Sequence, residues 1–451
     1  MKSQTKKSTV GYVCLNAKAS SELEKFMLNP LISQRYQLKR VDTSGFEIFN
    51  SNKFQIRLLK FLRKIHSFYH FTLIWKHRSS TLNYKLRAYC MFGTTKQFSK
   101  YSSFLIYQKL RVNFILRIAV KCAGNFFIIY LLRKFIYLYF TIVKVYNNKI
   151  LNNLDVIVFM YGARISLEQD YLVWISKRKK IRTVFIQENW DNLSSKTIMM
   201  EHPEFFATWG AQSTSHLKGI HKFSGTAREI GCVRLNPHFK IRAQMIQSNL
   251  AIEVSPKSIP TTKKLLVIGT GDGQHDFLLT QECARIITRI NESVESTFTI
   301  TYRPHPYGSN LVNNLDQISC LNNVYVQSPQ EGETSKTRAE IIMDCFAVIS
   351  LYSTMILEAS ILNKPCIIPG FIEKNWNYPV SQFLIESEHY KGMDLLESIF
   401  VPKSYIEFEE TLLNIDDLII KINNSKESIN WFCEDVNSID SFVQLLDMAT
   451  A

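Results

Sequence analysis

The chain has 451 residues, of which 46% are hydrophobic and 12% aromatic, and its formal net charge is +15. This composition supports large hydrophobic cores and excludes a globally disordered chain. At roughly 100–200 residues per domain, the length predicts two domains.

The positive charge is concentrated in one stretch of the chain. Residues 48–154 contain no Asp or Glu and hold 19 Lys and Arg. Taking these 19 from the 54 Lys and Arg of the whole chain leaves 35 against 39 Asp and Glu, so the rest has a net charge of −4. The stretch is therefore expected to attract an anionic partner.

Large apolar side chains are interleaved with these basic residues, as in 126–132 and 135–140. This pattern is typical of helices that lie in the interface of an anionic bilayer. We therefore predict that 48–154 is a basic helical insertion that associates with the membrane. Buried helices whose Lys and Arg reach solvent are the second interpretation, and nucleic acid is the one we disfavour.

Neither a membrane span nor a signal peptide is predicted. Runs without a charged residue in the basic stretch, such as 122–132, are shorter than the roughly 18 residues that a span needs. Residues 1–9 are polar and basic, without the apolar core of a signal peptide. We expect a cytoplasmic protein that is peripheral on the inner face of the cell membrane.

The nine cysteines are scattered and form no Cys-x-x-Cys pair, which favours buried, reduced thiols. The sequence shows no clustered Cys and His and no His-Glu-x-x-His motif, so we expect no metal site and no cofactor.

Strand-like and helix-like stretches alternate through the N-terminal half, which predicts a parallel sheet covered by helices. In chain order the predicted elements are strand 10–15, the basic helical segment, strand 154–162, helix 166–180, strand 181–187, strand 204–210 and helix 213–220.

A Pro- and Thr-containing linker is predicted at 248–264, and the same alternation restarts after it. The predicted elements are strand 264–269, helix 276–293, strands 297–302, 323–326 and 346–350, helix 353–362, strand 365–368 and a helical tail near 428–448. We predict an N-terminal domain 1–247, a nucleotide-donor domain 265–430 and a C-terminal helix 431–451. Two Rossmann-like domains facing across a cleft are the GT-B architecture, with ligands at the carboxyl ends of the strands.

Three polar motifs follow predicted strands of the C-terminal domain. Thr270, Gly271, Asp272 and Gly273 form a glycine-rich turn before a helix, where free N–H groups suit a phosphate; the alternative is a plain tight turn. Arg303, His305 and Pro306 follow the next strand. Arginine pairs with phosphate, and a histidine between two prolines can offset charge on a leaving nucleotide; the alternative is a Pro-rich loop.

Ser353 and Thr354 begin a predicted helix that carries Glu358, and together they suit a phosphate or ribose. The alternative is a routine helix cap with an acidic residue in the first turn.

A fourth motif, in the N-terminal domain, follows the strand 181–187. It holds the carboxylates Glu188 and Asp191, either of which can deprotonate an acceptor hydroxyl, with Asp191 slightly favoured. The predicted acceptor-binding side chains are Asn189, Trp190, Asn192 and Lys196. The alternative is an Asx-rich turn that packs between the domains.

The motif 303–306, together with Ser353–Thr354, Glu358–Ala359 and Lys364–Pro365, resembles the GT-B transferases of bacterial surface-polymer synthesis. Related patterns occur in CDP-glycerol glycerophosphotransferases and in CMP-sugar (sialyl- and Kdo-) transferases. The stretches 190–196 and 208–210 are similar to surface carbohydrate biosynthesis proteins of the same group. The resemblance covers about 155–371.

The resemblance implies an inverting, metal-independent transfer of a sugar or polyol-phosphate from a nucleotide-activated donor to a glycan or lipid-linked glycan. A base in the N-terminal domain activates the acceptor, while His305, Ser353 and Thr354 hold the nucleotide phosphates. Leu351 stands where the glycerophosphotransferase pattern has Asp, so the donor stays open among CMP-, CDP-, UDP- and GDP-linked groups. The alternatives are a nucleotide-sugar 2-epimerase-like enzyme and a non-catalytic membrane-associated binding module.

Overall fold

The structure, a computed structural model, divides into two compact units, and each is described by itself. Unit 1 comprises 1–233, 387–389 and 430–451, and unit 2 comprises 234–386 and 390–429. The described residues are 7–14, 17–42, 57–58, 60–63, 66, 131, 134–138, 140–141, 151–162, 165–196, 199–249, 262–269, 273–293, 297–305, 312–327, 335–351, 353–371, 388–393, 396–424, 429–435 and 437–451.

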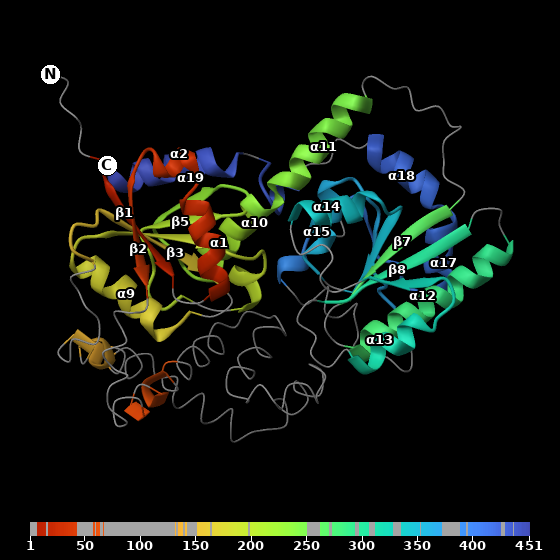
Figure 1. The fold of residues 1–451 in the computed structure, drawn as a ribbon, viewed down its shortest axis with the longest axis horizontal. Helices are drawn as coiled ribbons and strands as arrows, with labels where there is room; N and C mark the ends of the chain where they lie inside the picture. Colours follow the sequence, from red (N-terminus) through yellow and green to blue (C-terminus); the bar gives the residue numbers. More distant parts are fainter. Residues whose placement is uncertain are drawn as a thin grey trace. The chain divides into compact units, whose positions relative to one another are not determined.

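In these residues unit 1 holds a six-stranded parallel sheet with the strand order β2-β1-β3-β4-β5-β6. The strands are β1 (Thr9–Cys14), β2 (Gln37–Asp42), β3 (Val156–Tyr161), β4 (Arg182–Gln187), β5 (Phe205–Thr208) and β6 (Thr226–Glu229). The helices are α1 (Ala17–Met27), α2 (Pro30–Ser33), α9 (Leu167–Arg178), α10 (Ala211–Gly219) and α19 (Ser438–Thr450). Figure 1 shows α9 on one side of the sheet and α19 on the other.

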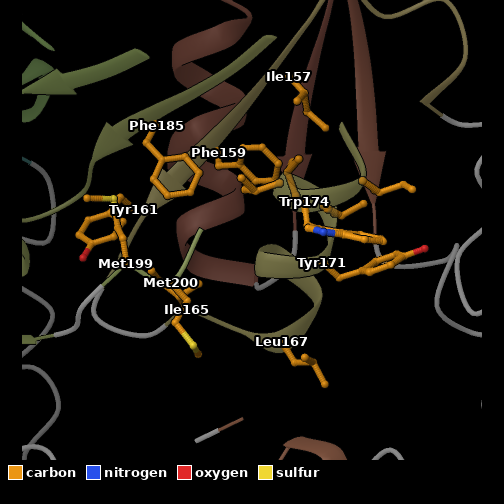
Figure 2. Close-up of a cluster of buried hydrophobic side chains, with 14 of the residues drawn as sticks. Ile157, Phe159, Tyr161, Ile165, Leu167, Tyr171, Trp174, Phe185, Met199 and Met200 are labelled. Carbon is orange, nitrogen blue, oxygen red and sulfur yellow. The ribbon is translucent and has the colours of Figure 1, made fainter. Parts of the chain in front are cut away.

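Alternating side chains of the central strands fill two separate cores. Ile157, Phe159 and Tyr161 point into the core that α9 covers, which Figure 2 shows. Val156 and Val158 point into the core on the opposite face, which α1, α2 and α19 cover. Because both faces of β3 are buried, its sequence is a continuous apolar run, as parallel strands require.

Helix α9 begins and ends where its sequence predicts. The hydroxyl of Ser166 accepts a hydrogen bond from the backbone N–H of Gln169 at 3.1 Å and caps the helix. The first turn carries Glu168 and the last turn Arg178, which complement the helix dipole.

Unit 2 holds, in its described part, a second six-stranded parallel sheet with the order β12-β11-β10-β7-β8-β9. The strands are β7 (Thr262–Ile268), β8 (Thr297–Arg303), β9 (Val324–Val326), β10 (Ala347–Ser350), β11 (Cys366–Ile367) and β12 (Ile399–Phe400). The helices are α11 (Asn236–Asn249), α12 (Gly273–Ser293), α13 (Val312–Ser319), α14 (Ser335–Met343), α15 (Met355–Ile361), α17 (Tyr405–Leu413) and α18 (Ile415–Asn424). The predicted α/β architecture with two parallel sheets is confirmed, while the predicted cleft stays a prediction.

The units divide the chain differently from the predicted boundaries. Helix α11 begins within the predicted N-terminal domain and ends at Asn249 in the predicted linker, but it belongs to unit 2, where it packs against α14 and α15. Strand β7 begins inside the predicted linker, at Thr262. The C-terminal helix α19 returns to unit 1, where Phe442, Leu445 and Leu446 are buried in its second core.

Most of the predicted basic insertion lies outside the described residues. Two described pieces are helical, at 57–58, 60–63 and 66 and at 131, 134–138 and 140–141, and residues 151–154 lead into β3. None of the helices within the described ranges is both long and apolar enough to cross a membrane.

Candidate functional site

Three neighbouring strands of unit 2 end in register, and each is followed by a predicted polar motif. Ile268 at the end of β7 pairs with Arg303 of β8 on one side and with Ser350 of β10 on the other. The backbone N–H of Gly269 donates to the carbonyl oxygen of Arg303 at 2.8 Å, which extends the ladder by one residue. The structure therefore brings the starts of all three predicted donor motifs to one edge of the sheet.

The glycine-rich motif is described only at its two ends. Thr270, Gly271 and Asp272 lie outside the described residues, and Gly273 is the first residue of α12. Gly269 is needed for close packing, because a β-carbon there would lie 2.6 Å from the Tyr302 hydroxyl and 3.0 Å from Asp276 Oδ2.

Asp276 is a buried carboxylate at this edge that our sequence analysis did not single out. It lies in the first turn of α12, is 1% exposed, and accepts a hydrogen bond from the Tyr302 hydroxyl at 3.3 Å. Burial raises the pKa of Tyr302, and the charge and hydrogen bond of Asp276 raise it further. In the sequence, a carboxylate in the first turn of a helix indicates only a residue that stabilises the helix dipole. The burial of Asp276 is what distinguishes it as a candidate site residue.

Arg303 has a protein partner, which the phosphate-binding prediction did not include. It is buried, and its Nη1 donates to Oε1 of Gln327 at 2.9 Å. Gln327 is held in turn by a hydrogen bond from its backbone N–H to the Tyr302 carbonyl. His305 is half-buried just beyond the strand, and Pro306 lies outside the described residues.

Ser353 caps the helix that follows it. Its hydroxyl accepts a hydrogen bond from the backbone N–H of Met355 at 3.2 Å, and α15 begins at Met355. Thr354 is helical in conformation, with φ −60° and ψ −22°, and its side chain makes no capping bond. Ser350, by contrast, is buried, and its hydroxyl has no hydrogen-bond partner within the described part of the chain.

Glu358, predicted to bind a ribose, is instead held inside unit 2. It is 3% exposed, and its Oε2 lies 3.1 Å from Nε of Arg338 and 3.2 Å from Nε2 of His238. Burial acts to raise its pKa, but the adjacent His238 and the charges of Arg338 and Arg234 outweigh it, so the pKa lies below its usual value. This carboxylate therefore joins α15 to α11 and α14, while its contact with a ribose stays a prediction.

In unit 1, the motif after β4 is fixed by one glutamine. Gln187 Oε1 accepts from the backbone N–H of Trp209 at 3.1 Å, and its Nε2 donates to the carbonyl oxygens of Asn189 and Trp190, both at 3.0 Å. The Trp209 indole N–H donates to the Gln187 carbonyl at 3.1 Å. The ends of β4 and β5 are thereby joined through a shared set of hydrogen bonds.

Trp190 and Asn192 are interior residues and not the sugar-binding surface we predicted. Trp190 is 1% exposed, its Nε1 donates to Oε1 of Gln212 at 2.8 Å, and its ring meets that of His389 edge-on. The buried amide of Asn192 donates to the Tyr161 carbonyl at 2.7 Å. Both side chains anchor the loop to the body of unit 1.

Three polar side chains of the same loop remain half-buried, namely Glu188, Asn189 and Asp191. The Glu188 carboxylate lies over Gly162 at the end of β3, since a β-carbon on that glycine would be 2.3 Å from Oε2. The side chain of Lys196 is not among those described, although its backbone ends the π-helix Asn192–Lys196. The loop therefore presents two carboxylates and one amide at the carboxyl edge of the sheet.

No set of three His, Cys, Asp or Glu side chains is placed to hold a metal ion in the described ranges.

Comparison with known proteins finds similarity at the level of solved structures. Neither a protein-family model nor a curated protein matches the sequence. The UDP-GlcNAc 2-epimerase of Methanocaldococcus jannaschii is 10% identical with a TM-score of 0.47, over 98% of this chain and 99% of that one. The UDP-GlcNAc 2-epimerase of Neisseria meningitidis has the same identity and TM-score, over 98% and 100%.

The wall teichoic acid polymerase TagF is 13% identical with a TM-score of 0.40, over 66% of this chain and 72% of that one. Because these TM-scores lie below 0.5, the similarity assigns neither a fold family nor an activity to this chain.

Proposed function

We propose that this protein is a GT-B enzyme that binds a nucleotide-activated donor at the carboxyl edge of the unit 2 sheet. The observation that carries the proposal is the register of Ile268, Arg303 and Ser350 across three adjacent strands. Open parallel sheets bind their ligands outside the carboxyl ends of the strands. Three polar motifs that are far apart in sequence therefore start at one such edge.

Within this site we assign the direct contact with the donor phosphates to His305. It is half-buried and follows β8 by two residues, so it can donate to an oxygen on which charge develops as the nucleotide leaves. Tyr302 is a positioning residue, because its hydroxyl is bonded to Asp276 within the unit. One donor of Arg303, Nη1, is bonded to Gln327, and we keep its guanidinium as a further donor-phosphate contact.

The chemistry we propose is an inverting transfer of a sugar or polyol-phosphate to a hydroxyl of a glycan or lipid-linked glycan. A carboxylate of unit 1, Asp191 or Glu188, takes the proton of that hydroxyl as its oxygen attacks the donor carbon or phosphorus. The bond to the nucleotide breaks, and its electron pair leaves with the nucleotide phosphate. Both carboxylates are half-buried and follow the end of β4, which supports this assignment.

A thermal-shift screen against CMP, CDP, UDP and GDP tests the donor site. A nucleotide at 100 times its Kd stabilises the folded protein by about 2.7 kcal/mol. We expect one nucleotide to raise the Tm of the wild type and of His202→Ala, a half-buried histidine of unit 1 that serves as the control. His305→Ala should lose the shift. A shift that survives His305→Ala in full would overturn the site assignment.

A nucleotide-sugar 2-epimerase is the second candidate, because Glu188 and Asp191 also suit removal of a proton from carbon. Incubating the enzyme with the stabilising donor in deuterated water separates the two activities. An epimerase returns the nucleotide-sugar with deuterium at the inverted carbon, without any acceptor. A transferase releases free nucleotide only when membranes carrying an acceptor are added. Binding without either product indicates the non-catalytic module.

A further inference from the structure

The two described helical pieces of the basic stretch, 57–66 and 131–141 with the gaps given above, each bury one face against unit 1. Leu62, from the first piece, and Ile136, Tyr137 and Phe140, from the second, belong to the core around α9. In Figure 1 both short helices lie beside the α9 end of unit 1. The second interpretation of this stretch, buried helices, therefore holds for one face of each piece.

Two polar side-chain contacts fix the first piece to the start of α9. His66 Nε2 lies 2.7 Å from Oδ2 of the buried Asp170, and Arg63 Nη2 lies 2.6 Å from Oε1 of Glu168. The first turn of α9 follows β3, so these contacts lie at the carboxyl edge of the unit 1 sheet. The loop that holds Glu188 and Asp191 leaves the same edge.

The opposite face of each piece exposes large apolar side chains. Leu131, Phe135 and Leu138 are 48%, 67% and 52% exposed, and their spacing of four and three residues forms one stripe along a helix. Phe61 of the first piece is 58% exposed. One apolar face of such a helix is enough to pack against the core, so a second apolar stripe in solvent is not needed for folding. Exposed apolar patches of this kind are typical of interaction surfaces.

The charge around these stripes has one sign. Arg57 and Lys60 are exposed beside Phe61, and no Asp or Glu occurs anywhere in 48–154. The carboxylates of Glu168 and Asp170 in the first turn of α9 are buried and paired with Arg63 and His66. An apolar stripe with basic flanks is complementary to the acyl boundary and anionic headgroups of a bilayer.

We propose that Phe61, Leu131, Phe135 and Leu138 form a lipid-docking face that inserts into an anionic bilayer, with Arg57 and Lys60 against its headgroups. The face holds the carboxyl edge of unit 1, and hence the loop with Glu188 and Asp191, near the membrane surface. This inference does not depend on the proposed reaction, because it rests on exposure, spacing and charge alone.

Vesicle flotation of the full chain tests the proposal, with vesicles of phosphatidylcholine alone or with roughly 30% phosphatidylglycerol added. The wild type should float with the anionic vesicles and far less with the neutral ones. The triple variant Leu131→Ser, Phe135→Ser, Leu138→Ser should lose about tenfold or more of its vesicle-bound fraction. Arg57→Gln with Lys60→Gln should weaken flotation and its dependence on salt.

The matched control is Leu28→Ser with Leu31→Ser, which removes two leucines of unit 1 that are similarly exposed outside the proposed face. It should float like the wild type. All variants change exposed side chains, so their Tm values should stay close to that of the wild type. Equal flotation of the triple variant, or a wild type that stays with neither vesicle, would overturn the proposal; the latter result would point to a protein or nucleic-acid partner.

Discussion

The carboxylate of Glu188 lies directly over Gly162, so that a methyl group on that glycine would come within 2.3 Å of Oε2. The atom in the way is the far end of a flexible side chain, and it can move without displacing the backbone. Gly162→Ala is therefore a substitution that shifts one carboxylate and spares the fold.

With Glu188 as the general base, Gly162→Ala should lower turnover by about tenfold or more, because a base displaced by an ångström loses its alignment. Its Tm should change by less than about 2 °C. The control is Gly219→Ala, since nothing lies within 4 Å of a β-carbon at that position. Unchanged turnover in Gly162→Ala would assign the general base to Asp191.

A second prediction concerns the buried carboxylate of unit 2. Glu358→Gln leaves Arg338 and His238 without their anionic partner, and we expect it to destabilise unit 2 by about 3 kcal/mol in urea unfolding. Glu409→Gln removes the surface partner of Arg289, at 2.8 Å, and should cost less than about 1 kcal/mol. Equal losses in the two variants would contradict the structural role assigned to Glu358.

The lowered pKa of Glu358 predicts how this difference depends on pH. A carboxyl whose native pKa lies below its unfolded value stabilises the fold above the unfolded pKa, and that stabilisation is lost as pH falls through the native pKa. The gap in unfolding free energy between wild type and Glu358→Gln should thus be full near neutral pH and shrink below the usual value of 4.5. A gap that stays constant into acid would show that the carboxylate is not the titrating group.

Trp190 supplies a fourth prediction. Trp190→Phe removes the 2.8 Å hydrogen bond to Gln212, which leaves a buried acceptor short of a donor and should cost about 1–3 kcal/mol of stability. Trp431→Phe, at an exposed tryptophan of the same unit, should be nearly neutral. If Trp190→Phe kept wild-type stability and only raised the KM for an acceptor, the sugar-binding interpretation would have to be restored.

A fifth prediction concerns the reactivity of two cysteines, Cys320 and Cys366. Burial raises the pKa of Cys366 to about 12, whereas Cys320 is exposed. At about pH 8 only on the order of one Cys366 in ten thousand is then a thiolate. Mass-spectrometric mapping of iodoacetamide labelling should find Cys320 modified in the native protein and Cys366 only after denaturation. Native labelling of Cys366 at a comparable rate would contradict its burial.

The sequence by itself determined the elements whose signals are local. The apolar run at β3, the Ser166 cap and the basic last turn of α9 each involve residues within a few positions of one another. The alternation of strands and helices in turn predicted two parallel sheets. The edge strands β2, β6 and β12 were not predicted. Strands β6 and β12, with four and two residues, carry too little periodicity, and the polar residues of β2, QLKRVD, give no apolar run.

Only the tertiary structure decided which polar residues are available for chemistry. Trp190 and Glu358 look like ligand-binding residues in sequence, but Nε1 of Trp190 is bonded to Gln212, and Oε2 of Glu358 lies against His238 and Arg338. Each partner comes from a different element, and nothing in a local pattern encodes which elements meet. In the basic stretch, composition predicted an apolar, cationic surface, yet Phe135 is exposed and Ile136 buried because only the face against α9 is covered. Which face of a helix is buried depends on contacts with residues far away in the sequence. The periodicity of the sequence shows which residues share a face, but it does not show which face is covered.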